Sequence, residues 1–253
     1  MSDFDRNYAT ATRSVGAGRA AVIDAGLRAY MIRVYNYMAM GVGLTGVAAW
    51  LTYQAAVVTN ASGAMTLTPF GAAIFGGPAV IVLMLGTFGL VMFISFRIQH
   101  LQPATALTLF LAYSALLGLM LSSVFLVYTH TSITRVFFIS AASFGGLSLY
   151  GYTTQRNLSA FGSFLTMGLI GLMIAMVVNM FFQSGVMQFI ISAAGVLIFA
   201  GLTAWNTQQI KEMYNTMDDG TIAGRKAVMG ALRLYLDFIN MFLFMLQLFG
   251  DRR

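Results

Sequence analysis

Asp237 is the residue of this chain whose surroundings point most strongly to chemistry. The chain contains eight Asp and Glu residues, and Asp237 is the only one inside an apolar segment, among leucine, phenylalanine and methionine side chains. An ionisable side chain at the centre of a membrane helix costs at least ~2.5–3.5 kcal/mol on insertion scales. A residue kept at that cost is a candidate for a functional site.

Three other polar residues lie on the same helical face as Asp237. Arg233 precedes it by four positions, Asn240 follows it by three, and Gln247 lies seven positions further. Such a stripe is expected to face other helices or water, because lipid cannot satisfy it. For Asn240 and Gln247 we favour a supporting role as hydrogen bonds between helices, worth about 0.6 kcal/mol on average in membranes. For Asp237 we favour function, because Asn or Ser would join helices at a lower cost.

The composition places this polar stripe in a membrane protein. Of the 253 residues, 58% are hydrophobic and 9% are charged, whereas soluble domains average about 25% charged residues. The net charge of +6 is explained by Lys and Arg that anchor loops at the lipid bilayer, so no nucleic-acid partner is expected. The absence of cysteine excludes disulfides, thiolate metal sites and Cys nucleophiles.

Seven apolar segments are long enough to cross the bilayer, which needs roughly 20 residues in a helix. They cover roughly residues 35–57, 79–96, 104–128, 136–152, 161–182, 187–207 and 227–249. The first begins too far from Met1 for an ordinary cleaved signal peptide. The sequence therefore predicts an all-α polytopic membrane protein, with a flexible, polar cytoplasmic segment at 1–33 and a seven-helix domain at 34–253.

The distribution of basic residues predicts the orientation, since cytoplasmic loops carry an excess of Lys and Arg. With the N-terminus in the cytoplasm and the C-terminus outside, only Arg135, Arg252 and Arg253 of the 14 basic residues fall outside. The others are expected on the cytoplasmic side: Arg6, Arg13, Arg19, Arg28, Arg33, Arg97, Arg156, Lys211, Arg225, Lys226 and Arg233.

Few residues can partner Asp237, and all lie toward the cytoplasmic ends of predicted helices. Arg233 is one turn earlier, Arg97 closes the second span, and Asn206 is at the inner end of the sixth. Asp237 lies about ten residues into its predicted helix, or ~15 Å deep, which is deeper than Asn206. The groups can meet only if the last helix starts in the cytosol or the sixth extends past Lys211.

Four stretches resemble motifs of a known family. They are YSAL at 113–116 continuing to LSS at 121–123, SLYGY at 148–152, GLTAWNTQ at 201–208 and LYLDFIN at 234–240. On these residues the chain resembles the bacterial branch of the Bax inhibitor-1 family, also called transmembrane Bax inhibitor motif proteins. The resemblance runs from about residue 30 to the C-terminus. It implies a bacterial inner membrane protein in which six helices surround the last one.

The resemblance also implies a function and a site. Family members are associated with pH-sensitive calcium leak, and in those that show it two aspartates, on the sixth and seventh helices, form a pair that an arginine latches. Asp237 matches the seventh-helix aspartate and Arg97 matches the arginine, but the sixth-helix position is Asn206. The resemblance thus implies a calcium-leak channel or ion-homeostasis protein that lacks one of the two carboxylates.

This departure has a physical consequence. Two close carboxylates cannot both ionise easily, which makes a proton switch, whereas Asn206 can donate a hydrogen bond to Asp237 while Arg233 or Arg97 pairs with it. We therefore expect Asp237 to stay ionised near neutral pH, with a pH response blunted relative to two-aspartate members. Calcium prefers several hard oxygen ligands. Asp237 is expected to hold Ca²⁺ only weakly and transiently, and no other cofactor is expected.

A non-conducting adaptor is the alternative function. Family members are also linked to stress responses and to restraint of membrane proteolysis, so the resemblance allows a protein that binds a membrane protease or another membrane protein. The polar segment 1–26 would then be a partner-binding tail, although such segments are more often simply disordered.

Two weaker motifs are better explained without function. Ser148 lies in a stretch superficially like the serine motif of intramembrane rhomboid proteases, but such a serine needs a base, and His100 and His130 fall in loops on opposite faces. An enzyme is therefore not expected. Asp218 and Asp219 lack the ligand spacing of a calcium loop and indicate a solvated turn.

Overall fold

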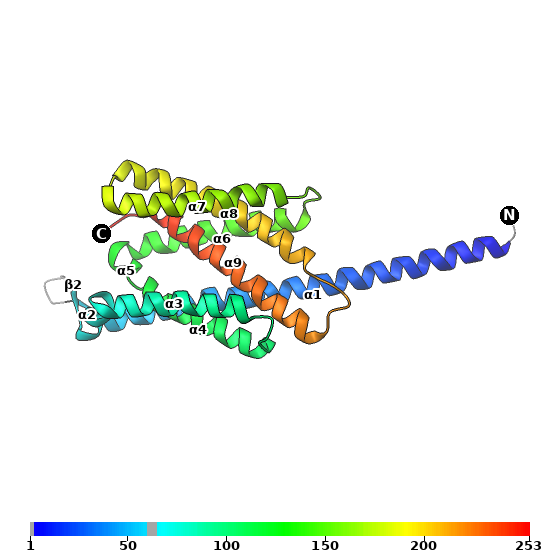
Figure 1. Cartoon of the computed structure of the whole chain (residues 1–253), viewed down its shortest axis with the longest axis horizontal. Coiled ribbons are helices and arrows are strands. Elements are labelled where there is room, and N and C mark those ends of the chain that lie inside the picture. The colour runs from blue at the N-terminus through cyan, green and yellow to red at the C-terminus, as the bar shows by residue number, and fades with distance from the viewer. Residues whose placement is uncertain (1–2, 60–64) are drawn as a thin grey trace.

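The structure is a computed structural model that describes residues 3–59 and 65–253, with side chains described for 25–58 and 65–253. The described residues form helices and one short hairpin (Figure 1). In order, the elements are α1 (Asp3–Ala56), β1 (Val57–Thr59), β2 (Met65–Leu67), α2 (Pro69–Phe75), α3 (Pro78–Arg97), α4 (Pro103–Leu121), α5 (Val124–Val127), α6 (His130–Thr153), α7 (Ser159–Phe182), α8 (Gly185–Glu212) and α9 (Gly220–Phe249).

The prediction of an all-α polytopic membrane protein is confirmed. Within the described residues, six helical segments are long and apolar enough to cross a membrane. They are α3, the run Pro103–Val127 that joins α4 and α5, and helices α6 to α9. These six contain the predicted spans from residue 79 onward. The first predicted span, 35–57, lies mostly in α1, which is outside this set.

Helix α9 is the most enclosed of the six. In its apolar stretch 72% of the residues are buried, against 28% or fewer in each of the others. It crosses obliquely between α7 and α8 on one side and α3 and α4 on the other (Figure 1), and it packs against α8, α1, α6 and α4. Of the polar stripe on α9, Asp237 is buried and Arg233 and Asn240 are partly buried, whereas Gln247 near the end of the helix is exposed.

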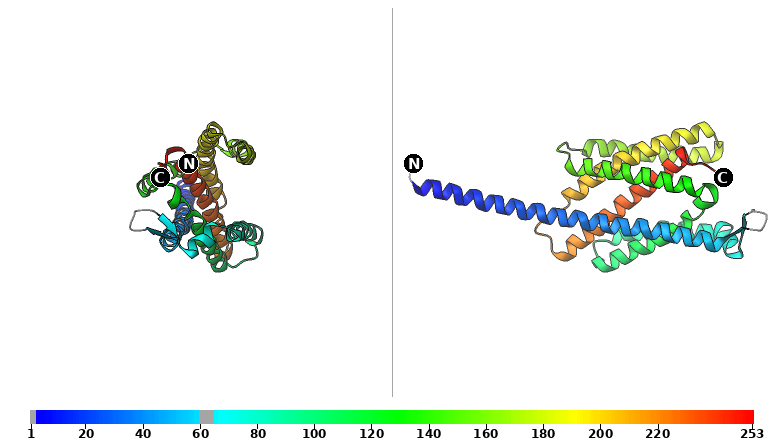
Figure 2. Two further views of the ribbon diagram at one scale, coloured as in Figure 1. Left: turned by 90° about the vertical axis from the view of Figure 1, so that its left-hand side faces the viewer. Right: turned by 180° about the vertical axis from the view of Figure 1, so that it is seen from behind.

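The two ends of the bundle differ in charge. The loops α3–α4, α6–α7 and α8–α9 lie at one end, toward the N-terminus, whereas the hairpin and the C-terminus lie at the other (Figures 1 and 2). Arg135 pairs with Asp251 at the C-terminal end, and Tyr128 bridges to Arg252 there. The described basic residues thus separate into the two groups that the sequence predicted.

Residues 3–33 form the first part of α1, a continuous helix whose beginning extends away from the bundle (Figure 2), whereas Tyr30 and Met31 near the end of this range are already buried in the core. Composition indicated a flexible polar segment here. A helix is consistent with its many Ala and Arg residues, which are strong helix formers. Its flexibility stays a prediction, because the described residues exclude 1–2 and the described side chains exclude 3–24.

The sequence did not predict the hairpin after α1. Strands β1 and β2 pair antiparallel, with Val57 opposite Leu67. The Thr68 side chain then accepts a hydrogen bond from the Gly71 amide and begins α2. At the same end the C-terminal tail is held in place, since the Arg253 amide donates to the Val127 carbonyl at 3.0 Å.

Candidate functional site

The ends of α8 and α9 decide which polar groups meet. Helix α8 continues to Glu212, five residues beyond the end of the predicted span 187–207. Helix α9 begins at Gly220, seven residues before the start of the predicted span 227–249. The Asp219 side chain accepts from the Ile222 amide at 2.7 Å and caps α9. Because α9 begins well before the apolar stretch, Asp237 and Asn206 reach the same level and the difference in depth disappears.

Asp237 is buried and forms a hydrogen bond with the partly buried Asn206. The Asn206 Nδ2 atom donates to the Asp237 Oδ2 atom at 2.7 Å, and Asp237 is 5% exposed. Helices α8 and α9 form the most extensive helix pair of the bundle, so this hydrogen bond lies in its best-packed interface. The structure thereby brings together the two positions at which the motifs place the family's ion site.

Two arginines were expected as partners of Asp237: Arg233, which is one turn earlier on the same helix, and Arg97, which matches the arginine of the family pattern. The Arg97 side chain at the end of α3 is exposed, and the ion pairs found among the described residues are Arg135–Asp251 and Lys226–Asp218. Neither arginine forms an ion pair with Asp237 among the described residues, although the charge of Arg233, one turn earlier on α9, acts on the Asp237 carboxyl. Arg97 does not pair with Asp237 because the two residues lie at different levels of the bundle. The loop that follows α3 contacts the first turns of α9, where Arg225 Nε donates to the Leu101 carbonyl at 2.6 Å.

Arg233 also acts on Tyr30, which lies at the end of the bundle that carries the α8–α9 loop. Burial, with a smaller contribution from the charge of Asp218, raises the pKa of the Tyr30 hydroxyl, which precedes the first predicted span, to about 12, and Arg233 opposes this rise. Tyr30 is buried and packs against Tyr214, with ring centroids 5.7 Å apart. Charges from α9 and from the α8–α9 loop therefore converge on this tyrosine.

The two supporting residues of the stripe behave differently. Gln247 joins helices, since its Oε1 atom accepts from Gln188 Nε2 at 2.8 Å and from Ser192 Oγ at 3.1 Å, both in α8. Asn240 instead donates to the carbonyl of Leu236 in its own helix at 2.8 Å. Gln247 therefore bonds across to the neighbouring helix α8, whereas Asn240 bonds its own backbone; the supporting role of both residues stays a prediction.

A chain of hydroxyl groups beside the pair was not predicted as a unit. Thr207, next to Asn206, lies 2.9 Å from the Ser148 Oγ atom, and Ser148 lies 2.6 Å from the Tyr35 hydroxyl. A second hydroxyl contact links Tyr235 of α9 to Thr45 of α1 at 2.6 Å. Ser148, Thr207 and Tyr235 all belong to the stretches that resemble family motifs. These stretches therefore contained a sign that their polar residues contact other residues in the core.

Gln208 completes the same motif and holds the α6–α7 loop. Its Oε1 atom accepts from the Leu158 amide, and its Nε2 atom donates to the Arg156 carbonyl, each at 2.8 Å. Gln208 is 4% exposed, so it satisfies two backbone groups of a loop that would otherwise lack partners. Its role is structural.

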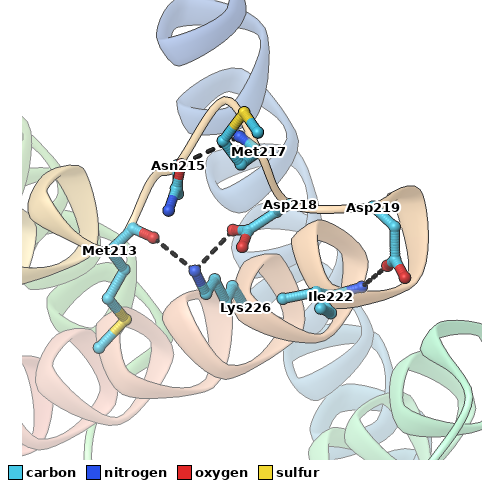
Figure 3. A network of polar contacts seen from close by, with 7 residues as sticks. All are labelled: Met213, Asn215, Met217, Asp218, Asp219, Ile222 and Lys226. Atoms are coloured by element: carbon cyan, nitrogen blue, oxygen red, sulfur yellow. Dashed lines mark hydrogen bonds and ion pairs between the residues drawn. The ribbon is translucent and has the colours of Figure 1, made fainter.

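The acidic pair in the α8–α9 loop also has structural roles. Lys226 Nζ donates to Asp218 Oδ2 at 2.5 Å and to the Met213 carbonyl at 2.9 Å, which draws the end of α8 toward α9 (Figure 3). Asp219 caps α9 through the Ile222 amide in the same view. These contacts support the interpretation of Asp218 and Asp219 as a turn rather than a calcium loop.

The oxygen atoms at the pair limit what it can bind. Within the part of the chain that the structure describes, no three His, Asp or Glu side chains group as a metal site. Asp237 and Asn206 offer one carboxylate and one amide oxygen, whereas Ca²⁺ takes six to eight oxygen ligands in stable sites. The arrangement suits a cation that passes and keeps most of its water.

The fold and the site define a class: a polytopic helical membrane protein with a buried carboxylate on its most enclosed helix, bound by an amide of the preceding helix. Comparison with known proteins identifies the family. Residues 27–253 match the family described as inhibitor of apoptosis-promoting Bax1. The chain belongs to the Bax inhibitor-1 family, as its motifs predicted.

Three similar bacterial proteins match nearly the whole length of the chain. The chain is 42% identical over 253 residues to an uncharacterized protein of Rickettsia prowazekii, covering 100% of both. It is 43% identical to the inner membrane protein YbhL of Escherichia coli, covering 90% of this chain and 94% of YbhL. An uncharacterized protein of Caulobacter vibrioides is 40% identical, with 100% of both covered. Together with the six apolar helices, these relatives support a multi-pass bacterial inner membrane protein.

Proposed function

We propose that this protein is a calcium-leak channel or ion-homeostasis protein of the bacterial inner membrane, and that Asp237 is the group that attracts the cation. The single observation that supports this most directly is the hydrogen bond from Asn206 to the buried Asp237 carboxylate. A carboxylate in this environment is costly, and Gln247 fulfils a helix-joining role on the same helix without a charge. Joining helices therefore does not account for Asp237.

The proposed topology has seven spans, with residues 35–57 of α1 as the first and α9 surrounded by the other six. The contacts of α9 with α1, α4, α6 and α8 support this arrangement. The N-terminus lies in the cytoplasm and the C-terminus outside, in keeping with the separation of basic residues between the two ends. Asp237 and Asn206 are then reached from the cytoplasmic side, past Tyr30 and the α8–α9 loop.

A single carboxylate sets the expected behaviour of the leak. Only one carboxylate, that of Asp237, faces the ion. A cation is therefore held briefly and released, which conduction requires. Asn206 cannot repel Asp237, so the proton switch that two close carboxylates create is absent. We therefore expect a calcium leak with little dependence on pH around neutrality.

Calcium flux into reconstituted vesicles, measured across pH, tests this function. The wild-type protein should exceed empty vesicles with a nearly flat pH profile, and Asn206→Asp should introduce pH dependence by placing a second carboxylate against Asp237. Asn240→Ala is the matched control, because Asn240 lies on the same helix and bonds only its own backbone. A wild-type flux with a midpoint near pH 7, or one no greater than that of empty vesicles, would contradict the proposal.

The second candidate function is an adaptor that binds a membrane protease or another membrane protein. The observation that favours it is the first part of α1, which extends away from the bundle and is available to a partner (Figure 1). Deleting residues 1–26 separates the two functions. Loss of partner binding with unchanged flux supports the adaptor, whereas loss of neither leaves the channel as the sole function.

We also propose that the protein is not an enzyme. The Ser148 hydroxyl is engaged by Tyr35 and Thr207. His130 begins the helix that carries Ser148, eighteen residues or ~27 Å away. Labelling by a serine-reactive fluorophosphonate probe, lost in Ser148→Ala, would contradict this proposal.

A further inference from the structure

A groove runs along the outside of the bundle between α1 and α6. Its volume is about 870 Å³, within the range of small-molecule and lipid sites. The walls include Ile32 on α1 and Phe144 and Leu149 on α6. Ile32 and Leu149 are 51% and 63% exposed, so the groove opens sideways onto the apolar surface that faces lipid.

The floor of the groove is polar where the walls are apolar. Tyr35 and Ser148 line it and connect through their 2.6 Å hydroxyl contact to Thr207 of α8. These hydroxyls lie deeper in the bilayer than the groove mouth, because Tyr35 follows Arg28 by seven residues of helix, or ~10 Å. A ligand that fits this floor carries hydrogen-bond acceptors between a charged head and an apolar tail.

The mouth of the groove is basic. Arg28 lines it from α1, with an exposed side chain that forms no hydrogen bond or ion pair with another described side chain. Tyr152 lines it from α6, and Lys211 lies over the Tyr152 ring at 5.6 Å. Lys211 Nζ donates once, to the Tyr152 carbonyl, which leaves two of its three protons for an anion.

We propose that this groove is a binding site for an anionic phospholipid of the leaflet at the α8–α9 loop end of the bundle. Arg28 and Lys211 bind the phosphate, the Tyr35 and Ser148 hydroxyls meet the ester carbonyls, and one acyl chain lies along Ile32 and Phe144. A soluble anion would find the basic mouth but would leave the apolar walls uncovered. A protein helix would cover the walls but would leave both cations without a counter-charge.

The site lies beside the hydrogen-bonded pair of Asp237 and Asn206 without depending on it. Thr207, at the end of the hydroxyl chain, is adjacent to Asn206, and the Phe144 wall contacts Phe238 with ring centroids 5.6 Å apart. Phe238 is adjacent to Asp237. The bound lipid therefore packs against residues that position the carboxylate, yet lipid binding is measured directly and needs no ion flux.

Two glycines of α6 provide a matched pair of variants. Gly145 lines the groove and Gly146 does not, and a Cβ atom at either position would meet no atom within 4 Å. Gly145→Trp should fill the groove and Gly146→Trp should leave it open. Native mass spectrometry of protein extracted from vesicles of equal phosphatidylglycerol and phosphatidylcholine measures the lipid retained.

Wild type and Gly146→Trp should retain phosphatidylglycerol, and Gly145→Trp should not. Equal retention of phosphatidylglycerol by Gly145→Trp and Gly146→Trp would overturn the proposal, as would retention of phosphatidylcholine in preference.

Charge variants test the head-group contact in the same assay. Arg28→Gln and Lys211→Gln should each weaken phosphatidylglycerol binding about fivefold, and Arg135→Gln, at the opposite end of the bundle, should not. Excess inorganic phosphate should fail to displace the lipid. If phosphate displaces it, or if Arg135→Gln weakens binding as much as Arg28→Gln, the assignment to this groove is wrong.

Discussion

Gly151 of α6 packs directly against the backbone of Ala204 in α8, and adding one methyl group there should loosen the helix that carries Asn206. A Cβ atom on Gly151 would lie 2.9 Å from the Cα and carbonyl carbon of Ala204, and closer still to its carbonyl oxygen. All three are backbone atoms and cannot turn aside as a flexible side chain would. Gly151→Ala must therefore push α6 and α8 apart, and Asn206 lies only two residues beyond the contact.

The magnitude follows from comparison with a second glycine of the same helix. Overpacking of a well-packed contact costs ~1–3 kcal/mol, while replacing a helical Gly by Ala gains up to ~1 kcal/mol from helix propensity. Gly146→Ala receives the same gain without the contact, since nothing lies within 4 Å of its Cβ position. The two variants should thus differ by ~1–3 kcal/mol in the free energy of unfolding, with Gly151→Ala the less stable.

Reversible unfolding in mixed micelles with increasing dodecyl sulfate measures this difference. Trp205 follows Ala204 in α8 and reports on the contact by its fluorescence. If Gly151→Ala unfolds at the same detergent fraction as Gly146→Ala, the close packing of α6 on α8 is wrong. The position derived for Asn206 would then be wrong as well.

Three further predictions concern the end of the bundle that carries the α6–α7 and α8–α9 loops. Gln208→Leu should destabilise the protein by ~1–3 kcal/mol, because it leaves two buried backbone groups of the α6–α7 loop unpaired; hydrogen exchange should rise in that loop first. Tyr30→Phe should be neutral or stabilising by about 1 kcal/mol, because the buried Tyr30 hydroxyl has no hydrogen-bond partner among the described residues; a lower unfolding midpoint would contradict this. In a double-mutant cycle of Lys226→Met and Asp218→Asn, the coupling energy should be about 1 kcal/mol or less, since the side chains of Lys226 and Asp218 are 31% and 12% exposed and water screens the pair. A coupling energy above ~2 kcal/mol would contradict this screening.

Apolar length predicted the helices that dominate the fold. The segments from residue 79 onward are helical, because roughly 20 apolar residues leave a membrane chain little choice but a helix. The segment 104–128 is the exception to a continuous helix, since it is divided into α4 and α5 at Ser122 and Ser123. The ends of α8 and α9 were missed because a hydropathy pattern stops where polarity begins, whereas a helix stops at its cap. The Asp219 cap was present in the sequence but was interpreted as part of a turn.

The partners of Asp237 were only partly predictable. The motif spacing indicated Asn206 correctly, because both residues lie in stretches that pack against each other. The ionic partners were not found, since the level at which the α3–α4 loop meets α9 depends on tertiary packing through Leu101 and Arg225. The hairpin after α1 was missed for a similar reason: its three-residue strands carry too short a pattern to detect.

The central claim is that the Asp237 carboxylate attracts the cation that leaks across the membrane. The most direct measurement is calcium flux at neutral pH into vesicles that contain equal amounts of wild type, Asp237→Asn or the control Asn240→Ala. Asp237→Asn keeps nearly the same shape and removes the charge, so its flux should fall toward that of empty vesicles while Asn240→Ala matches wild type. Equal flux through wild type and Asp237→Asn would contradict the claim.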